Sequence, residues 1–175
     1  MYALINWVRH LIYDPVGADQ VFTDDEIQDA LDRHRLNVHN LSLTPQETRA
    51  LGQATAYYDY YAAFGDWEDD PTVIDCNYTE ISSTGYTFEP LVGHWTFTTS
   101  QTPPVYATGR IYDVYAAAAD LLEAWAAREK LSFDFSTDGQ NLQRSQKAQA
   151  LRELAREYRR QQRPISVGMV RSDVV

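Results

Sequence analysis

The sequence predicts an α+β fold: a small helical bundle core of N-terminal helices and two long C-terminal helices, with an inserted β-rich module. Apolar residues recur at helical spacing near both ends of the chain. Between them, residues 41–109 are rich in Tyr, Thr, Gly and Pro and contain short alternating runs typical of strands. The expected units are the N-terminal helices (1–40), the inserted module (41–109), the C-terminal helices (110–163) and a tail (164–175).

The N-terminal segment predicts two amphipathic helices. The buried face of the first is expected to be Leu4, Ile5, Val8, Leu11 and Ile12. Arg9, His10 and Tyr13 are expected to point elsewhere, and Pro15 to end the helix. A capping box at 23–26 begins the second helix, which is expected to continue to about residue 37. Its buried stripe is expected to be Ile27, Ala30, Leu31 and His34.

The inserted segment predicts short strands bounded by turn residues. Residues 54–63, ATAYYDYYAA, have the Tyr and Thr density of a strand. Pro45 also suits the first turn of a helix, so a helix over 45–63 remains the alternative. Further strands are expected at 72–76, 78–81, 91–98 and 105–108.

Two long helices are expected over about 112–131 and 142–162. An Asp-Gly turn in the connection lets them pack antiparallel, and Asp138 or Asn141 can cap the second helix. The connection also matches the first six positions of a calcium loop that starts at Asp134. Its twelfth position is Ser145 instead of a bidentate glutamate, so we expect no calcium site.

The bulk composition suits an ordinary cytoplasmic domain. The chain of 175 residues is long enough to bury its own core, and its one cysteine, Cys76, leaves no internal disulfide. The N-terminus lacks the basic region and the small-residue cleavage site of a signal peptide. The longest apolar run is interrupted by Asp120 and Glu123 and is shorter than the ~20 residues of a membrane span. We therefore expect no membrane partner.

The charge is divided unevenly along the chain. Residues 1–140 contain 22 acidic and 7 basic residues, a balance of −15, whereas residues 141–175 contain 3 acidic and 8 basic residues, a balance of +5. Such a division bears on partners and not on the fold. An acidic body with a basic end has two complementary surfaces, which favours binding to its own copies or to a scaffold.

The sequence lacks the arrangements that catalysis and metal binding require. His34 and His39 miss the i, i+4 spacing of two imidazoles on one metal. No nucleophile elbow and no phosphate-binding glycine loop is present. The acidic run at 66–70 is expected to be a solvated loop, with a metal-assisted hydrolase as the alternative. We therefore expect no enzyme activity, no catalytic residues, no cofactor and no metal.

A basic stripe follows the last helix. Arg152, Arg156, Arg159 and Arg163 fall at i, i+4, i+7 and i+11. The stripe is interpreted as a solvated face, as a contact for phosphates, or as a docking surface for an acidic partner. A nucleic-acid-binding module that uses this stripe, with the tyrosines at 57–61 for base stacking, is the alternative function. The net charge of −10 disfavours it, because such affinity comes largely from neutralised phosphates.

Three segments of the C-terminal half carry a resemblance. They are YDVYAAAADLLE at 112–123, FDFSTDG at 133–139 and SQK at 145–147. Together they resemble the head–tail connector (adaptor) proteins of tailed bacteriophages, the neck components that ring the underside of the portal. The likeness is closest over about 104–163. The N-terminal helices and the stretch GDWED at 65–69 fit the family more loosely, and the inserted module matches least.

The resemblance implies a structural virion protein with a helical core that forms a twelve-fold ring between portal and tail. The implied partners are its own copies, the portal protein, the next neck or tail protein, and DNA that passes without specific binding. A twelve-copy ring would carry about −120 formal charges, and an acidic channel repels phosphate. The implied location is the neck of the virion, assembled in the host cytoplasm.

By the same likeness, the last helix and the tail engage the portal's lower rim. The portal-docking candidates are Arg152, Arg156, Arg159, Arg163, Ile165, Val167, Met169, Val170 and Arg171. The acidic-loop candidates, expected to face the channel, a neighbouring subunit or the next ring, are Asp66, Glu68, Asp69 and Asp70.

Overall fold

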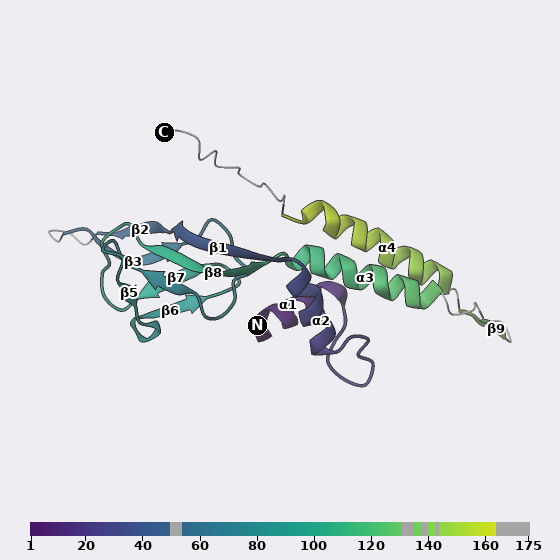
Figure 1. The fold of residues 1–175 in the computed structure, drawn as a ribbon. Coiled ribbons are helices and arrows are strands. Elements are labelled where there is room, and N and C mark those ends of the chain that lie inside the picture. The colour runs from purple at the N-terminus through teal and green to yellow at the C-terminus, as the bar shows by residue number, and fades with distance from the viewer. Residues whose placement is uncertain (50–53, 131–134, 138–139, 143, 164–175) are drawn as a thin grey trace.

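The computed structural model describes residues 1–49, 54–130, 135–137, 140–142 and 144–163. These residues form an elongated molecule with a helical lobe at one end and a β lobe at the other (Figure 1). Four helices and two four-stranded antiparallel sheets confirm the expected α+β class. The two lobes have separate apolar clusters, and the chain crosses between them at the start of β1 and at the end of β8.

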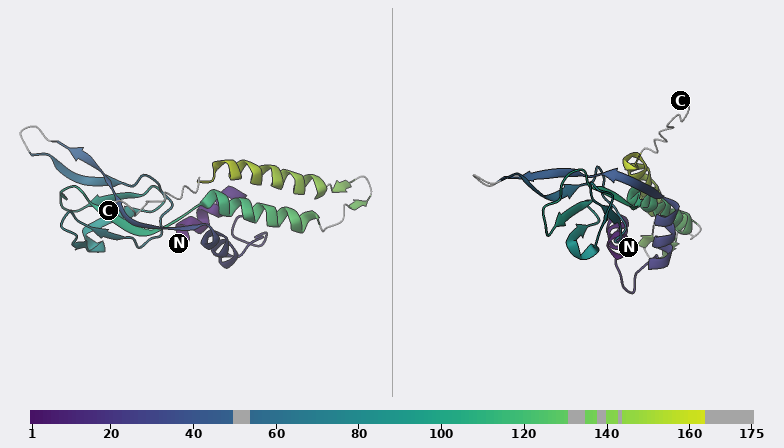
Figure 2. Two further views of the ribbon diagram at one scale, coloured as in Figure 1. Left: turned by 45° about the horizontal axis from the view of Figure 1, so that its top comes forward. Right: turned by 60° about the vertical axis from the view of Figure 1, so that its left-hand side comes forward.

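The helical lobe is built around α3 (Val114–Lys130). On one side lies α4 (Arg144–Gln161), and on the other lie α1 (Tyr2–Ile12) and α2 (Asp24–Arg33) (Figures 1 and 2). A run of buried alanines on α3 lets these helices approach closely. The helices α3 and α4 run antiparallel, as the sequence predicts. This direction follows from two contacts: Lys147 with Glu129, and Arg159 with Asp120.

Arg9 departs from the expectation that it points away from the core. Its side chain is only 4% exposed and contacts Asp14, which is 1% exposed, at 3.1 Å. The guanidinium also donates to Asp24 Oδ1 at 2.6 Å and to the Phe22 carbonyl at 2.9 Å. Asp14 in turn accepts from the backbone N–H groups of Val21 and Phe22. This network ties the end of α1 to the start of α2.

The capping box at the start of α2 is confirmed. Thr23 Oγ1 accepts from the Glu26 N–H, and the Glu26 carboxylate accepts from the Thr23 N–H at 2.9 Å. The bond from the Thr23 backbone is the main cause that lowers the pKa of Glu26, and a hydrogen bond from Arg128 adds to it. The carboxylate form of Glu26 is therefore favoured in the folded protein.

Glu26→Ala is expected to lower the free energy of unfolding by about 0.5–1 kcal/mol at neutral pH, because a helix cap and a half-exposed ion pair are lost. Since folding lowers the pKa of Glu26, this contribution is complete above the unfolded-state pKa and disappears as pH falls through the folded-state value. Urea unfolding of both proteins across acidic and neutral pH measures the difference. Gln28→Ala, at an exposed position of the same helix, is the control; a gap that stays constant in acid would contradict the expectation.

The second helix ends earlier than expected, at Arg33 instead of about residue 37. His34 is its C-cap, and its side chain contacts Asp120 of α3 at 2.8 Å instead of joining the buried stripe. The chain then enters strand β1 (Arg35–Ser42), which pairs with β8 (Tyr106–Tyr112) from Arg35↔Tyr112 onward. The β lobe therefore begins near residue 35 and not at 41, because backbone pairing to β8 replaces the last helical turn.

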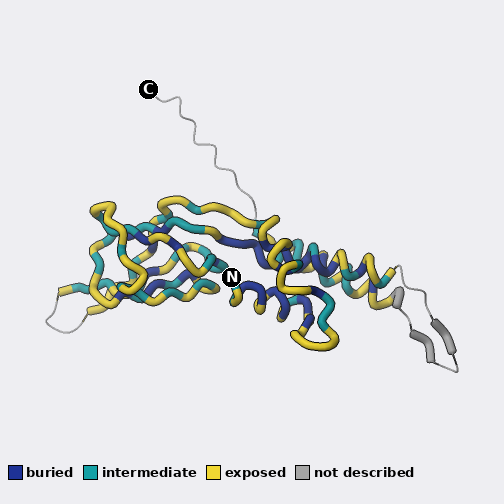
Figure 3. The backbone as a smooth tube through the Cα atoms, turned by 60° about the horizontal axis from the view of Figure 1, so that its bottom comes forward, coloured by how far each residue is buried: buried dark blue, intermediate teal, exposed yellow. Residues whose placement is uncertain are grey.

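The β lobe consists of two antiparallel sheets. One has the order β1-β8-β4-β5, with β4 at Thr72–Ile74 and β5 at Glu80–Ile81. The other has the order β2-β3-β7-β6, with β2 at Thr44–Thr48, β3 at Ala56–Tyr61, β6 at Tyr86–Glu89 and β7 at His94–Phe97. A 3₁₀ turn, η1 (Ser83–Gly85), precedes β6. Buried residues, in dark blue, lie mainly along the inner segments of both lobes, and exposed residues, in yellow, lie mainly in the outer loops (Figure 3).

The two sheets decide whether residues 45–63 form strands or a helix. The parts described, β2 and β3, are strands that pair with each other, so the helical alternative is wrong for them. The expected strands at 54–63, 72–76, 78–81, 91–98 and 105–108 correspond to β3, β4, β5, β7 and β8, whereas β1, β2 and β6 were not predicted as strands. Tyr60 is fully buried against Phe97, while Tyr61 stacks on His94 at 4.3 Å.

Between α3 and α4 the chain forms a short hairpin of β9 (Phe135–Thr137) and β10 (Gln140–Leu142), which were not predicted as strands either. Asp134, the first position of the calcium-loop pattern, and Asp138, one of the two capping candidates, lie outside the described residues. Asn141 lies inside β10, before α4 begins at Arg144, so it is not the residue that caps this helix.

Candidate functional site

Two of the four stripe arginines fasten α4 to the rest of the chain. Arg159 contacts Asp120 at 2.8 Å and Glu123 at 3.1 Å, both on α3, and the hydrogen bond that Arg159 donates to Glu123 is the main cause that raises the pKa of Arg159. Arg163 contacts Asp66 of the β lobe at 2.7 Å and donates to the Gly65 carbonyl at 3.0 Å. Both guanidinium groups are therefore engaged within the chain.

The residues at the end of α4 contact both lobes at the junction between them. The backbone N–H of Arg163 donates to Asp113 Oδ2 at 2.6 Å, while Asp113 Oδ1 accepts from the Ala116 N–H in the first turn of α3. A 280 Å³ pocket at this junction is lined by Arg33, His34, Arg35, Leu36, Asp113, Ala116, Gln162 and Arg163. One carboxylate thus caps α3 and holds the end of α4.

The other two stripe arginines, Arg152 and Arg156, make no ion pair with any described residue. They lie along a 350 Å³ groove between α3 and α4, whose lining is Lys130, Ala148, Gln149, Arg152, Glu153 and Arg156. The sequence analysis did not include Lys130. Its position at the end of α3 places it beside these arginines because the two helices run antiparallel. The remaining portal-docking candidates, Ile165, Val167, Met169, Val170 and Arg171, lie outside the described residues.

The acidic run at 66–70 is not a uniformly solvated loop. Trp67, in its middle, is fully buried and packs edge-on against Trp95 at 5.4 Å between ring centroids. Glu68 contacts Arg110 at 3.0 Å, and Asp69 contacts the N-terminal amine. Asp70 is exposed. The buried tryptophan separates the carboxylates, so they do not share one surface.

Asp66 lies at the junction with a positive φ of 60°. Burial raises the pKa of Asp66, with a smaller contribution from the nearby Asp113 carboxylate, and Arg163 opposes both. Asp69 and Asp70, by contrast, line a 720 Å³ cavity between the start of α1 and the β lobe. The four acidic-loop candidates therefore occupy three environments: Asp66 lies at the junction, Glu68 contacts Arg110, and Asp69 and Asp70 line the cavity.

A further surface, on the outer side of α1, carries exposed apolar side chains. Tyr2, Tyr13 and Val16 are largely exposed, and Trp7 is partly exposed and stacks on His10 at 5.7 Å. A shallow 460 Å³ groove lies there, lined by Asn6, Arg9, His10, Tyr13, Asp14, Pro15 and Val16. His10 and Tyr13 were expected off the buried face, but the contact of the His10 ring with both Trp7 and Tyr13 was not predicted.

The described residues contain no group of three His, Cys, Asp or Glu side chains placed to hold a metal ion. Two of the described histidines contact a carboxylate: His34 contacts Asp120 at 2.8 Å, and His94 contacts Asp59 at 3.0 Å. Among the described helices, none combines the length and hydropathy that crossing a bilayer requires.

Comparisons were made at the levels of family, sequence and fold. No protein-family model, no curated protein and no solved structure matches this chain. The functional interpretation therefore depends on the residues and the geometry given above.

Proposed function

We propose that this chain is a structural subunit of a phage neck, which forms a ring that joins the portal to the tail and lets DNA pass. The observation that carries the proposal is the likeness of residues 112–123, 133–139 and 145–147 to head–tail connectors. The first and last of these segments belong to α3 and α4, the central helix pair of the helical lobe. The proposed place of action is the virion.

The surface chemistry supports a role in assembly. Lys130, Arg152 and Arg156, which have no ion pair with any described residue, line the groove between α3 and α4, while exposed aromatic side chains lie along α1. Closed rings form through head-to-tail contacts, which need two different complementary patches on one chain. Exposed apolar groups beside charged ones are typical of surfaces that bind other proteins. The proposed partners are other copies, the portal and the next neck or tail protein.

The geometry narrows the proposed portal contact. Arg159→Glu would place a third carboxylate beside Asp120 and Glu123, so this change would disturb the α3–α4 packing whether or not the residue meets a portal. Arg163 is likewise engaged within the chain, because it contacts Asp66 of the β lobe. We therefore assign portal docking to the tail at 164–175, with its five candidates Ile165, Val167, Met169, Val170 and Arg171.

A chain that stops after Pro164 is expected to fold as stably as the full chain and to lose binding to the portal protein of the same virus. Arg163, which anchors the end of α4, is retained in this variant. Co-sedimentation with purified portal measures the binding, and thermal unfolding followed by circular dichroism measures the fold. Equal portal binding by both chains would contradict the assignment of the tail, and no binding by the full chain would contradict the proposed function.

The alternative function, nucleic-acid binding, is favoured by one observation: Lys130, Arg152 and Arg156 line one groove. It predicts retention of DNA whose logarithm falls linearly with the logarithm of salt concentration. A gel-shift titration at low salt separates the two proposals, because a neck subunit with net charge −10 is expected to leave DNA unshifted.

A further inference from the structure

We propose that neighbouring copies of this chain join through the acidic face of α2 on one copy and the basic groove between α3 and α4 on the next. The proposal rests on the proposed ring and specifies which surfaces form it. It assigns Arg152 and Arg156 to the contact between copies, whereas portal docking stays assigned to the tail at 164–175. Its basis is charge complementarity between two helix faces that have no charged partner among the described residues.

The basic side is the groove beside α4. Lys130 and Arg156 are exposed and Arg152 is partly exposed, and these three side chains account for the cations along it. Glu153 is the one acidic residue of the lining, and it accepts a hydrogen bond from Gln149 on its own helix at 3.0 Å. The groove therefore keeps an excess of positive charge and has room, at 350 Å³, for side chains from outside.

The acidic side is the outer face of α2. Asp25, Asp29 and Asp32 fall at i, i+4 and i+7, all are exposed, and none pairs with a cation among the described residues. The opposite face of this helix buries Ile27 and Leu31 against the core. Three aligned carboxylates repel one another, so a cationic partner would relieve this repulsion.

The two faces have matching directions and spacings. Glu26 contacts Arg128 while His34 contacts Asp120, so α2 runs antiparallel to α3. The helix α4 also runs antiparallel to α3, so α2 and α4 point the same way. Asp25 and Asp29, like Arg152 and Arg156, are four residues apart, about 6 Å along a helix.

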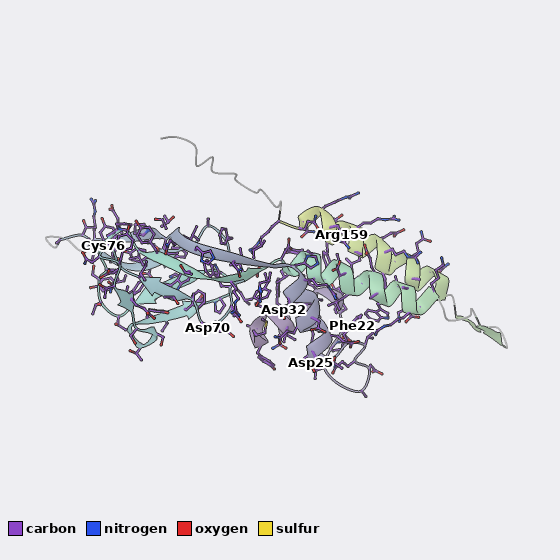
Figure 4. All side chains as sticks on the ribbon, viewed as in Figure 1. Phe22, Asp25, Asp32, Asp70, Cys76 and Arg159 are labelled. Carbon is purple, nitrogen blue, oxygen red and sulfur yellow. The ribbon has the colours of Figure 1, made fainter. Side chains whose placement is uncertain are left out.

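The faces also lie at the same level of the bundle. Asp120 contacts both His34, just after α2, and Arg159 on α4. Asp25, Asp29 and Asp32 precede His34 by nine, five and two residues, and Arg152 and Arg156 precede Arg159 by seven and three, so both sets flank the same stretch of α3. Figure 4 labels Asp25 and Asp32 on the α2 side of α3 and Arg159 on the α4 side.

A contact between these two faces repeats head to tail. Because α2 and α4 lie on opposite sides of α3, a copy that offers its α2 to one neighbour leaves its groove free for another (Figures 1 and 2). Contacts of this kind close into a ring when the rotation between copies permits. Exposed charges are screened over about 10 Å at 0.1 M salt, so assembly is expected to weaken as salt rises.

The test is a charge swap between two variants. Asp29→Lys with Asp32→Lys makes the α2 face basic, and Arg152→Glu with Arg156→Glu makes the groove acidic. Each variant alone is expected to assemble at least ~100-fold more weakly than wild type, because like charges then meet. An equimolar mixture is expected to regain assembly, since the basic α2 face of the first variant fits the acidic groove of the second, and the unchanged acidic α2 face of the second fits the unchanged basic groove of the first. Asp19→Lys with Glu80→Lys, two exposed sites elsewhere, is the control and is expected to assemble as wild type does.

Mass photometry with and without purified portal measures assembly, and circular dichroism shows that each variant is folded. Normal assembly of either folded variant alone would overturn the proposed contact and leave the neck function standing. Folded variants that fail both alone and mixed would also overturn it, because their defect would not come from pairing. If the wild type never assembles, with or without portal, the neck function itself fails and the contact fails with it.

Discussion

Arg9→Met is expected to lower the free energy of unfolding by about 3–5 kcal/mol, because it leaves the carboxylate of Asp14 buried without its cation. Methionine fills most of the space but cannot donate to Asp14 or to the Phe22 carbonyl. The loop between α1 and α2, which this network holds, is then expected to loosen. Urea unfolding followed by circular dichroism measures the loss.

The matched control for Arg9 is Arg33→Met. Arg33 is 60% exposed and its nearest carboxylate, Asp120, is 3.8 Å away, so its removal is expected to cost less than about 1 kcal/mol. A small effect at Arg9, similar to that at Arg33, would mean that the buried ion pair does not hold the N-terminal helices together.

Trp67→Ala is expected to lower the free energy of unfolding of the β lobe by about 3–5 kcal/mol, the usual cost of removing a fully buried large aromatic side chain. The Trp67 ring packs on Trp95 and Phe64, and its Nε1 donates to the Phe64 carbonyl at 2.8 Å. Its removal leaves a cavity between the two sheets and frees the acidic run at 66–70 from its anchor.

Trp7→Ala is the control for the change at Trp67. Trp7 is 36% exposed on α1 and stacks only on His10 among the aromatic contacts of the described residues, so a much smaller loss is expected. Thermal unfolding of both variants, followed by near-ultraviolet circular dichroism, compares the two lobes. Equal losses at both sites would contradict the view that Trp67 holds the acidic run in the β-lobe core.

Helical periodicity predicted the helical lobe well, because α1 and α2 each bury one apolar face and the central α3 is buried on most sides. The boundary at residue 35 was missed for a physical reason. Val38 continues the apolar spacing of α2, and no glycine or proline marks the change from helix to strand. What ends the helix is pairing with β8, a partner about 70 residues further along the chain.

The candidate site could be predicted only in part. Sequence spacing placed four arginines on one helix face, but it could not show that Asp120 and Asp66 occupy two of them. These partners come from another helix and from the other lobe. Arg9 was misjudged similarly, since Asp14 and Asp24 surround it only after the loop folds back.

The acidic run at 66–70 contains a tryptophan, which indicates burial, and a count of charges does not take it into account. The tryptophan at the second position of this run is the residue most costly to leave in water, so Trp67 turns inward, and its neighbours Asp66 and Glu68 are partly buried against Arg163 and Arg110. Patterns of charge along a sequence therefore predict a solvated loop reliably only where no large aromatic residue interrupts them.

The central claim is that this chain forms a ring on a phage portal, and electron microscopy of the purified chain mixed with the portal protein of the same virus tests it most directly. The account predicts portal particles that carry an added ring on their lower rim. Bare portals beside monomers of this chain, at concentrations high enough to saturate binding, would contradict it.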